Sequence, residues 1–206
     1  MGKFITLEGV EGVGKTTNLN FIANYLTSNG KDIITTREPG GTAIAEKIRG
    51  LLLEHHTEKL CNEAELLLMF AARAQHLEQV IKPALAAGKW VVCDRFTDAT
   101  YAYQGGGRDF KMADIQWFEN FVQKGLSPDT TILLDLPVEV GLKRAADRSE
   151  PDRFEAEKKA FFNNVRQVYL DRAKAEPNRF CLVDASESIK QVQSNIQRYL
   201  DNILLG

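Results

Sequence analysis

Apolar residues in this chain gather in short runs that are rich in β-branched side chains. Polar and apolar residues do not alternate cleanly within these runs, which is the pattern of strands buried on both faces. The runs predict strands at residues 4–8, 32–37, 90–94, 130–136 and 180–184.

The segments between these runs carry helical periodicity. In 43–53, for example, apolar residues recur at Ile44, Ile48 and Leu51, and Pro83 is expected to kink or shorten the end of a longer helix. The predicted helices cover residues 15–27, 43–53, 62–87, 112–124, 138–148, 155–174 and 187–204. Strands that alternate with helices over the full length predict an α/β fold, in one domain spanning 1–206, with a parallel sheet covered on both faces.

Composition narrows the function. The chain has 206 residues, of which 26 are basic and 28 acidic, so its net charge of −2 does not predict a nucleic-acid partner. Anions must therefore be bound at a local basic site. We expect no membrane span, because no run approaches about 20 apolar residues. The three cysteines are far apart and lack metal-ligand spacing, and no secretory signal precedes them, so a cytoplasmic protein is expected.

The stretch GVEGVGKTT follows the first predicted strand and precedes a predicted helix. Gly9, Gly14, Lys15 and Thr16 fit the pattern G-x-x-x-x-G-K-[ST], in which backbone N–H groups and a helix N-terminus surround phosphate oxygens. Lys15 is expected to reach the β- and γ-phosphates, and the Thr16 hydroxyl to ligate Mg²⁺. We predict that ATP binds along Gly9, Val10, Glu11, Gly12, Val13, Gly14, Lys15, Thr16 and Thr17.

Two basic motifs at strand ends indicate a kinase whose acceptor is itself a phosphate. TREPGGT places Arg37 at the end of the second strand, before the turn at Pro39. Ligands bind at that edge of open α/β sheets, and a guanidinium fork suits an acceptor phosphate. CDRF ends the third strand with Asp94, which can hold Mg²⁺ directly or through water, and Arg95, which can bridge donor and acceptor phosphates.

A third basic motif, KRAADRSEPDRFE, predicts a mobile lid at about 143–155. Arg144 and Arg148 share one helical face, and Arg153 follows a proline that interrupts the helix. The phosphate-binding loop at residues 9–17, called the P-loop below, contains no arginine. The positive charge that assists phosphoryl transfer is therefore expected from the lid, where such arginines raise the rate by a factor of roughly 10³–10⁵.

Together these motifs resemble bacterial thymidylate kinases, which phosphorylate dTMP to dTDP with ATP and Mg²⁺ in dTTP biosynthesis. The resemblance runs over nearly the whole chain and includes LEGVEGVGKTT, TREPGGT, LLLMFAARAQH, IKPAL, DRF…AYQGGGR, PDTTILLDL and DRFE. It implies a P-loop NTPase fold with strand order 2-3-1-4-5 and a homodimer packed through helices.

The resemblance also implies roles near the acceptor's phosphate and sugar. Glu11 matches the P-loop carboxylate that contacts the ribose 3′-hydroxyl of dTMP, which would explain an acid beside phosphates. Arg37 and Arg95 match the groups that hold the dTMP phosphate. Tyr103 matches the aromatic residue that disfavours a ribose 2′-hydroxyl, and Arg153 is the lid arginine that best matches the one assisting transfer.

At the base, Arg73 matches the arginine that hydrogen-bonds thymine, and Gln104 is placed beside the base and sugar. Thymine usually stacks on an aromatic residue four positions before that arginine. This chain has Met69 there, and Phe70 lies three positions before, on the same helical side. Phe70 is our choice for the stacking group, with Met69 as the alternative.

A second departure lies after the Asp-Arg pair. The family serine five residues after that aspartate is Ala99 here, and Thr100 and Thr97 are the candidates to replace its hydrogen bond. The preference for thymine over uracil rests on the resemblance alone.

Two other functions share part of this pattern. A deoxynucleoside kinase that phosphorylates thymidine also has a P-loop, a lid and a nucleoside pocket, but it has no acceptor phosphate for Arg37 to bind. A catalytically silent P-loop interaction module would not need Lys15, Thr16 and Asp94 intact.

Overall fold

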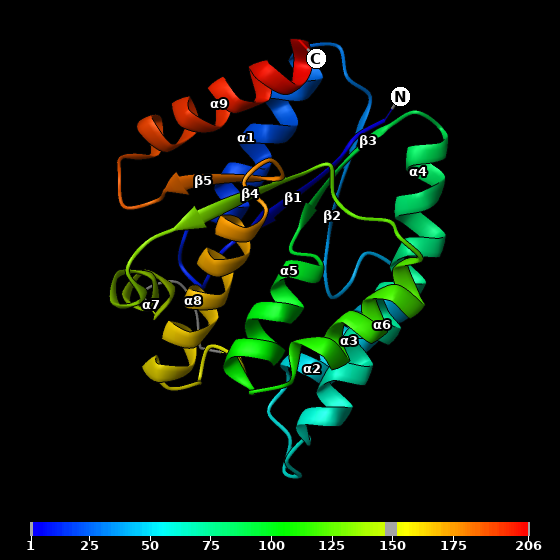
Figure 1. The fold of residues 1–206 in the computed structure, drawn as a ribbon, viewed down its shortest axis with the longest axis vertical. Coiled ribbons are helices and arrows are strands. Elements are labelled where there is room, and N and C mark those ends of the chain that lie inside the picture. Colours follow the sequence, from blue (N-terminus) through cyan, green and yellow to red (C-terminus); the bar gives the residue numbers. More distant parts are fainter. Residues whose placement is uncertain (1, 147–151, 206) are drawn as a thin grey trace.

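The computed structural model describes residues 2–146 and 152–205, and its strands form one parallel sheet (Figure 1). The strands are β1 (Phe4–Glu8), β2 (Ile33–Arg37), β3 (Trp90–Asp94), β4 (Thr130–Asp135) and β5 (Phe180–Asp184). Their order is β2-β3-β1-β4-β5, and every neighbouring pair is parallel. The predicted strands and the order that the resemblance implied are confirmed.

Helices connect the strands and cover both faces of the sheet (Figure 1). In chain order they are α1 (Lys15–Ser28), α2 (Ala43–Leu53), α3 (Asn62–His76), η1 (Leu77–Ile81), α4 (Lys82–Ala86), α5 (Thr97–Thr100), η2 (Tyr101–Gly107), α6 (Met112–Gln123), α7 (Val138–Ala146), α8 (Lys159–Ala175) and α9 (Ile189–Leu205). Helix α1 packs on β2 and β3 and against α9, which packs on β5; α4 and α8 contact the sheet from the other side. No helix within the described ranges combines the length and the apolar content needed to cross a bilayer.

The helix predicted at 62–87 is confirmed in extent, because α3, η1 and α4 follow one another without a break from Asn62 to Ala86. It is not shortened at Pro83; the π-helical turn η1, which ends two residues before that proline, interrupts the regular α-helix instead. A wider turn there re-routes the hydrogen bonds that a proline would interrupt. The pattern also predicted no helix at 97–107, where the structure has α5 and η2.

The central strands are buried along their length. Ile5 and Leu7 of β1 and Ile132 of β4 are inaccessible to solvent, as are Ile22 and Leu26 of α1, which belong to the same apolar cluster. Each such side chain contributes about 1.5–3 kcal/mol when fully buried. The apolar runs of the sequence therefore become the core that fixes the sheet.

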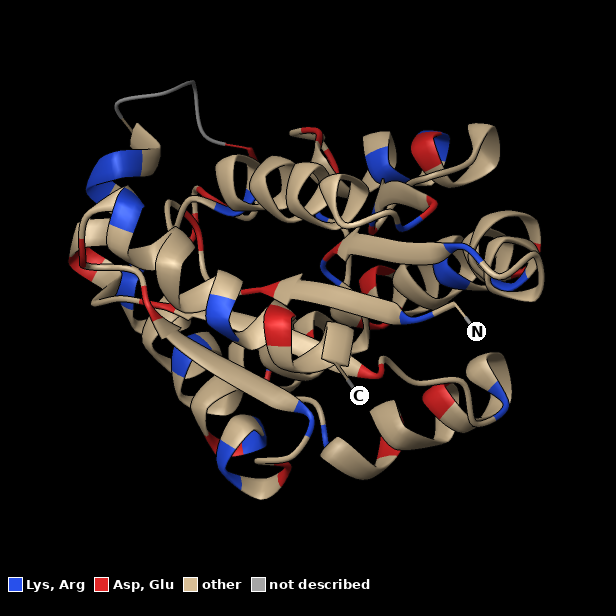
Figure 2. Cartoon of the chain, turned by 90° about the horizontal axis from the view of Figure 1, so that it is seen from above, with Lys and Arg blue, Asp and Glu red and all other residues tan. Residues whose placement is uncertain are grey.

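The last residue of each strand carries a charged side chain. In Figure 2 the strands are uncharged along most of their length, and the last residues of the five strands are Glu8, Arg37, Asp94, Asp135 and Asp184. All five strands run in one direction, so these groups gather along one edge of the sheet, the edge at which α/β folds bind ligands.

Candidate active site

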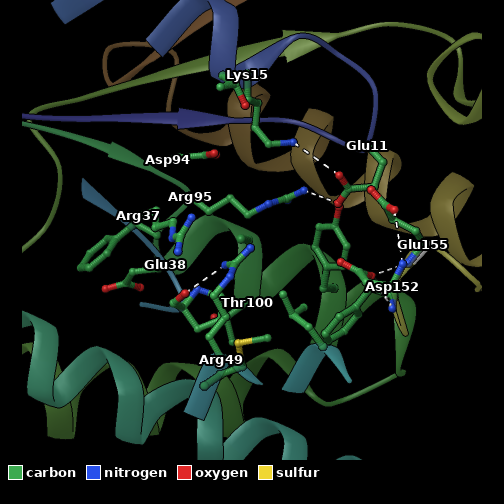
Figure 3. Close-up of a pocket in the computed structure, with 18 of the residues that line it drawn as sticks. Glu11, Lys15, Arg37, Glu38, Arg49, Asp94, Arg95, Thr100, Asp152 and Glu155 are labelled. Atoms are coloured by element: carbon green, nitrogen blue, oxygen red, sulfur yellow. Dashed lines mark hydrogen bonds and ion pairs between the residues drawn. The ribbon is translucent and has the colours of Figure 1, made fainter. Parts of the chain in front are cut away.

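A cavity of about 270 Å³ opens at the carboxyl ends of β1, β2 and β3 (Figure 3). Its walls come from the loop after β1, the turn after β2, helices α2 and α3, the segment after β3, and the chain that leads into α8. The motifs at the strand ends thus meet in one place.

The loop after β1 has the backbone of a phosphate-binding loop. Gly14 adopts a left-handed conformation (φ 88°) directly before α1, and Gly12 (φ 72°) passes so close to α7 that an added Cβ would lie 1.9 Å from the Gly141 carbonyl oxygen. Lys15 Nζ bonds to the carbonyl oxygens of Gly9 (3.2 Å) and Val10 (2.9 Å), at the mouth of the loop. Burial, followed by the charge of a neighbouring arginine, lowers the pKa of Lys15 below its usual value.

Arg95 is held from three sides. Its Nη2 lies 2.5 Å from Glu11 Oε1 (Figure 3). Its Nη1 bonds to Tyr169 Oη at 3.3 Å, and its Cζ lies 4.7 Å from the centre of the Tyr103 ring. Tyr103 Oη also donates to Glu11 Oε1 at 3.0 Å. The P-loop acid, the arginine after β3 and the tyrosine of η2 therefore form one network that faces the cavity.

The arrangement of Asp94 and Thr16 fits a magnesium ion. Both line the cavity, and Asp94 Oδ1 is buried without a hydrogen-bond donor among the described residues. An unsatisfied buried carboxylate oxygen and a hydroxyl that line one cavity supply the oxygen ligands that Mg²⁺ accepts, and that ion commonly takes only one or two protein ligands in addition to substrate phosphates.

Two more arginines line the cavity, one at the end of β2 and one on α2. Arg37 forms an exposed ion pair with Glu46, with Nη2 and Oε2 at 2.8 Å, and also lines the cavity, as does Pro39. Arg49 of α2 lines it too and donates from Nη1 to the Pro39 carbonyl oxygen at 3.0 Å. Burial, followed by the charge of Arg37, lowers the pKa of Arg49.

Arg49 was not predicted from the sequence. It follows the buried Ala45 by four residues and precedes the buried Leu52 by three, so it lies on the inward face of α2. A cation on the apolar stripe of a helix that begins at a ligand-binding turn is a signal the sequence offered.

The far end of the cavity is built around Arg73. This buried guanidinium donates from Nε to Glu38 (2.7 Å) and from Nη2 to Thr100 Oγ1 (2.9 Å), while its Nη1 has no acceptor among the described residues. Gln104 of η2 lines the same region, and Ala99 lies beside Thr100. Of the two candidate hydroxyls, Thr100 faces this end.

Two neighbouring residues point elsewhere. Thr97 bonds to Gln123. Phe70, our choice for stacking the base, is 2% exposed and stacks on Phe118 at 5.2 Å, so it belongs to the core, and Met69 lines the cavity in its place. Successive residues of an α-helix point about 100° apart, so the four-residue spacing from Arg73 falls on the cavity face of α3 and the three-residue spacing on the face toward α6.

The residues of the predicted lid lie in different places relative to the cavity. Arg148 lies outside the described residues. Arg153 does not line the cavity; its Nε donates to the Leu52 carbonyl oxygen at 2.7 Å and its Nη2 lies 2.7 Å from Glu65. It lines a second hollow instead, together with Arg108, Glu157 and residues 55–60. Arg144 donates to the Ala185 carbonyl oxygen at 3.2 Å. The residues of this segment that line the cavity are Asp152, Phe154 and Glu155.

The remaining P-loop residues are arranged around their backbone. Val10 and Val13 point into the core, and the cavity is lined by Glu11, Gly12, Gly14, Lys15 and Thr16 but not by Gly9 or Thr17. A phosphate-binding loop at the head of a parallel sheet, facing a second group of arginines across one cavity, defines a P-loop protein of the kinase class.

Comparison with known proteins agrees with this class. The family model for thymidylate kinase matches residues 7–196. Thymidylate kinases of Pseudomonas putida GB-1 and Pseudomonas syringae pv. tomato are each 57% identical over 203 residues, which is 98% of this chain and 97% of theirs. The crystal structure of thymidylate kinase from Ehrlichia chaffeensis superposes with a TM-score of 0.78 at 33% identity and covers 97% of this chain and 98% of its own. The chain belongs to the thymidylate kinase family.

Proposed function

We propose that the protein transfers the γ-phosphoryl group of ATP to the 5′-phosphate of dTMP, giving ADP and dTDP, and so supplies a precursor of dTTP. Family membership over nearly the full chain supports this reaction. The observation that carries it is the placement of Arg37, Arg49 and Arg95 opposite the P-loop in one cavity. Thymidine brings no acceptor phosphate for these arginines, so the deoxynucleoside kinase alternative is not favoured.

On the donor side, ATP would bind along the P-loop. Lys15 is placed at the mouth of the loop, where it can exchange its bonds to backbone carbonyls for bonds to the β- and γ-phosphates. Thr16 and Asp94 would hold Mg²⁺, which when bound neutralises charge on the phosphate oxygens.

On the acceptor side, Arg37 and Arg95 would hold the dTMP phosphate, and Arg95 also lies near enough to the P-loop acid to stand between donor and acceptor. Glu11 would contact the ribose 3′-hydroxyl of dTMP rather than phosphate, and the 3.0 Å hydrogen bond that it accepts from Tyr103 supports this role, because it holds the carboxylate beside the residue assigned to the sugar. The ring of Tyr103 would disfavour a sugar with a 2′-hydroxyl through its bulk.

At the base, the open Nη1 of Arg73 is a donor for a thymine carbonyl oxygen, and it is fixed there by Glu38 and Thr100. Met69 provides the apolar wall. The transfer itself needs no strong general base, because the acceptor phosphate is already anionic near neutral pH. Catalysis would consist of positioning and of charge neutralisation by cations fixed in advance.

We propose the segment 143–155 of this single domain as the lid. For Arg153 to assist transfer, it must exchange Glu65 for the phosphates, since its guanidinium now bonds to the Leu52 carbonyl oxygen and pairs with Glu65. Arg144 already bonds to the loop after β5 and would border the nucleotide on the donor side.

We further propose a homodimer formed through α2, α3 and α6. Trp117 and Phe121 of α6 are 60% and 67% exposed and stack on each other at 5.5 Å, and Leu67 of α3 is 53% exposed. Exposed aromatic side chains on packed neighbouring helices mark a contact surface. A cytoplasmic location, our remaining proposal, is supported by three free thiols.

The deciding experiment is an acceptor panel. The purified protein is given ATP and Mg²⁺ with dTMP, dUMP, dCMP, dGMP or thymidine, and ADP release is followed in a coupled assay. We expect the highest kcat/KM with dTMP. Preference for thymidine would replace the proposal with the deoxynucleoside kinase reaction, and ATP binding without turnover on any acceptor would indicate a silent P-loop protein.

A further inference from the structure

A buried carboxylate lies behind the wall of the cavity. Glu65 of α3 is 1% exposed, yet it contacts three polar side chains, two from the end of η2 and one from the chain that leads into α8. It accepts a hydrogen bond from Gln104 Nε2 at 2.9 Å and from Arg108 Nε at 3.2 Å, and Arg153 Nη2 lies 2.7 Å away. Of these, only Gln104 is among the described residues that line the substrate cavity.

The chemistry of Glu65 decides which way the Gln104 amide points. The oxygen and nitrogen of a side-chain amide have nearly the same shape, and only their partners distinguish them. A carboxylate accepts hydrogen bonds and has none to donate, so the amide nitrogen must face Glu65. The Gln104 amide oxygen is then left for the cavity, and no hydrogen bond among the described residues uses it.

This orientation selects among pyrimidines. The N3 atom of thymine or uracil carries a hydrogen and donates, whereas the N3 atom of cytosine has a lone pair and accepts. An amide oxygen directed at N3 is therefore matched to the first pair and opposed to the second. We propose that Glu65 is a positioning residue for base selectivity, which holds the Gln104 amide so that the enzyme favours dTMP over dCMP. The inference rests on the proposed function.

The effect can be separated from a loss of stability by Glu65→Gln. A glutamine at this position keeps the shape but can donate as well as accept, so the Gln104 amide is able to turn and present its nitrogen to cytosine. We expect the ratio of kcat/KM for dTMP to that for dCMP to fall roughly tenfold to a hundredfold, the value of one mispaired hydrogen bond. Where dCMP is not turned over, its inhibition constant against dTMP replaces kcat/KM.

Two further variants test whether the effect acts through Gln104 and whether it is specific to Glu65. In a Gln104→Ala background, Glu65→Gln should leave the ratio unchanged, because the residue acts through the amide that has been removed. Asp98→Asn is the matched control. Asp98 is equally buried and binds Arg172 (2.6 Å) and Arg179 (2.7 Å), but does not line the cavity, so its loss should lower the melting temperature and leave the ratio alone.

An unchanged ratio in folded Glu65→Gln, with both substrates slowed equally, overturns the proposal. If that variant does not fold, Glu65→Asp retains the charge for the arginines and withdraws the oxygen from Gln104; an unchanged ratio there has the same consequence. Failure of the wild-type protein to phosphorylate dTMP would instead reject the proposed function, so the two failures are distinguishable.

Discussion

Arg95 is the residue whose replacement tests the proposed reaction most directly. It follows β3 with a positive φ of 66°, and Glu11, Tyr169 and Tyr103 fix its guanidinium before any ligand enters. A guanidinium has more N–H donors than these two hydrogen bonds use, so part of the fork stays available for phosphate oxygens.

The magnitude follows from that geometry. Losing a charged donor that is already in place for a transferring group costs about 2.7–4 kcal/mol, or roughly 10²–10³ in rate. We expect a fall of that order in kcat for Arg95→Met, which keeps an unbranched apolar chain against Tyr103. Arg95→Lys keeps a point charge but loses the planar fork, so its fall should be smaller while its KM for dTMP still rises.

The assay is steady-state ADP release at varied dTMP, with melting temperatures measured in parallel. Arg172→Met is the matched control, because Arg172 also pairs with a buried carboxylate and lies 3.9 Å from the centre of a tyrosine ring, but it is outside the cavity. It should lower the melting temperature and retain kcat/KM. A folded Arg95→Met enzyme with wild-type kcat would refute the reasoning.

Three other perturbations test separate parts of the site. Asp94→Asn should raise the Mg²⁺ concentration needed for half-maximal activity by roughly 10- to 100-fold, and an unchanged requirement in a magnesium titration would remove Asp94 from the metal site. Trp117→Glu places a charge in the proposed dimer surface and should yield monomers by light scattering; a dimer of wild-type mass would point to another surface. Burial of Glu8, together with the charge of Asp98, raises the pKa of Glu8 to about 8 from its usual 4.5. The folded state then binds that proton more tightly than the unfolded state, so the free energy of unfolding should fall as pH rises from about 4.5 to 8, each unit of difference in pKa being worth about 1.4 kcal/mol. Urea unfolding of Glu8→Gln should show a shallower slope across that range, and an equal slope would contradict the shift.

The fold could be predicted because its determinants are local in the sequence. A strand buried on both faces must be an uninterrupted apolar run, and the P-loop must join a strand to a helix. Elements that depend on their neighbours escaped prediction. The helical segment 97–107 contains three glycines near its end and has no clear apolar stripe, yet it is held in place by α8, which packs along it.

In the candidate site, the residues at strand ends could be predicted from the sequence, whereas the side chains on helices could not. Residues at strand ends, such as Arg37 and Asp94, are positioned by the sheet itself, so a motif at the end of a strand is enough to place them. Side chains on helices depend on rotation, and one residue separates the cavity wall at Met69 from the core at Phe70. The contact of Arg153 with a distant carboxylate has no signature in the sequence at all.

Two site arginines each pair with a carboxylate, and the exposure of these pairs explains how the arginines can be held in place before dTMP binds and still bind its phosphate. Arg37 and Glu46 form a pair whose side chains are 53% and 38% exposed, whereas the side chains of Arg95 and Glu11 are 15% and 17% exposed. An exposed ion pair is worth at most about 1 kcal/mol, so an entering phosphate can displace Glu46 at little cost. Separating a largely buried pair leaves an uncompensated charge and costs several times more. Binding of dTMP should therefore exchange the partner of Arg37 but add to the partners of Arg95. Arg37→Met should for this reason act mainly on KM, and Arg95→Met on kcat.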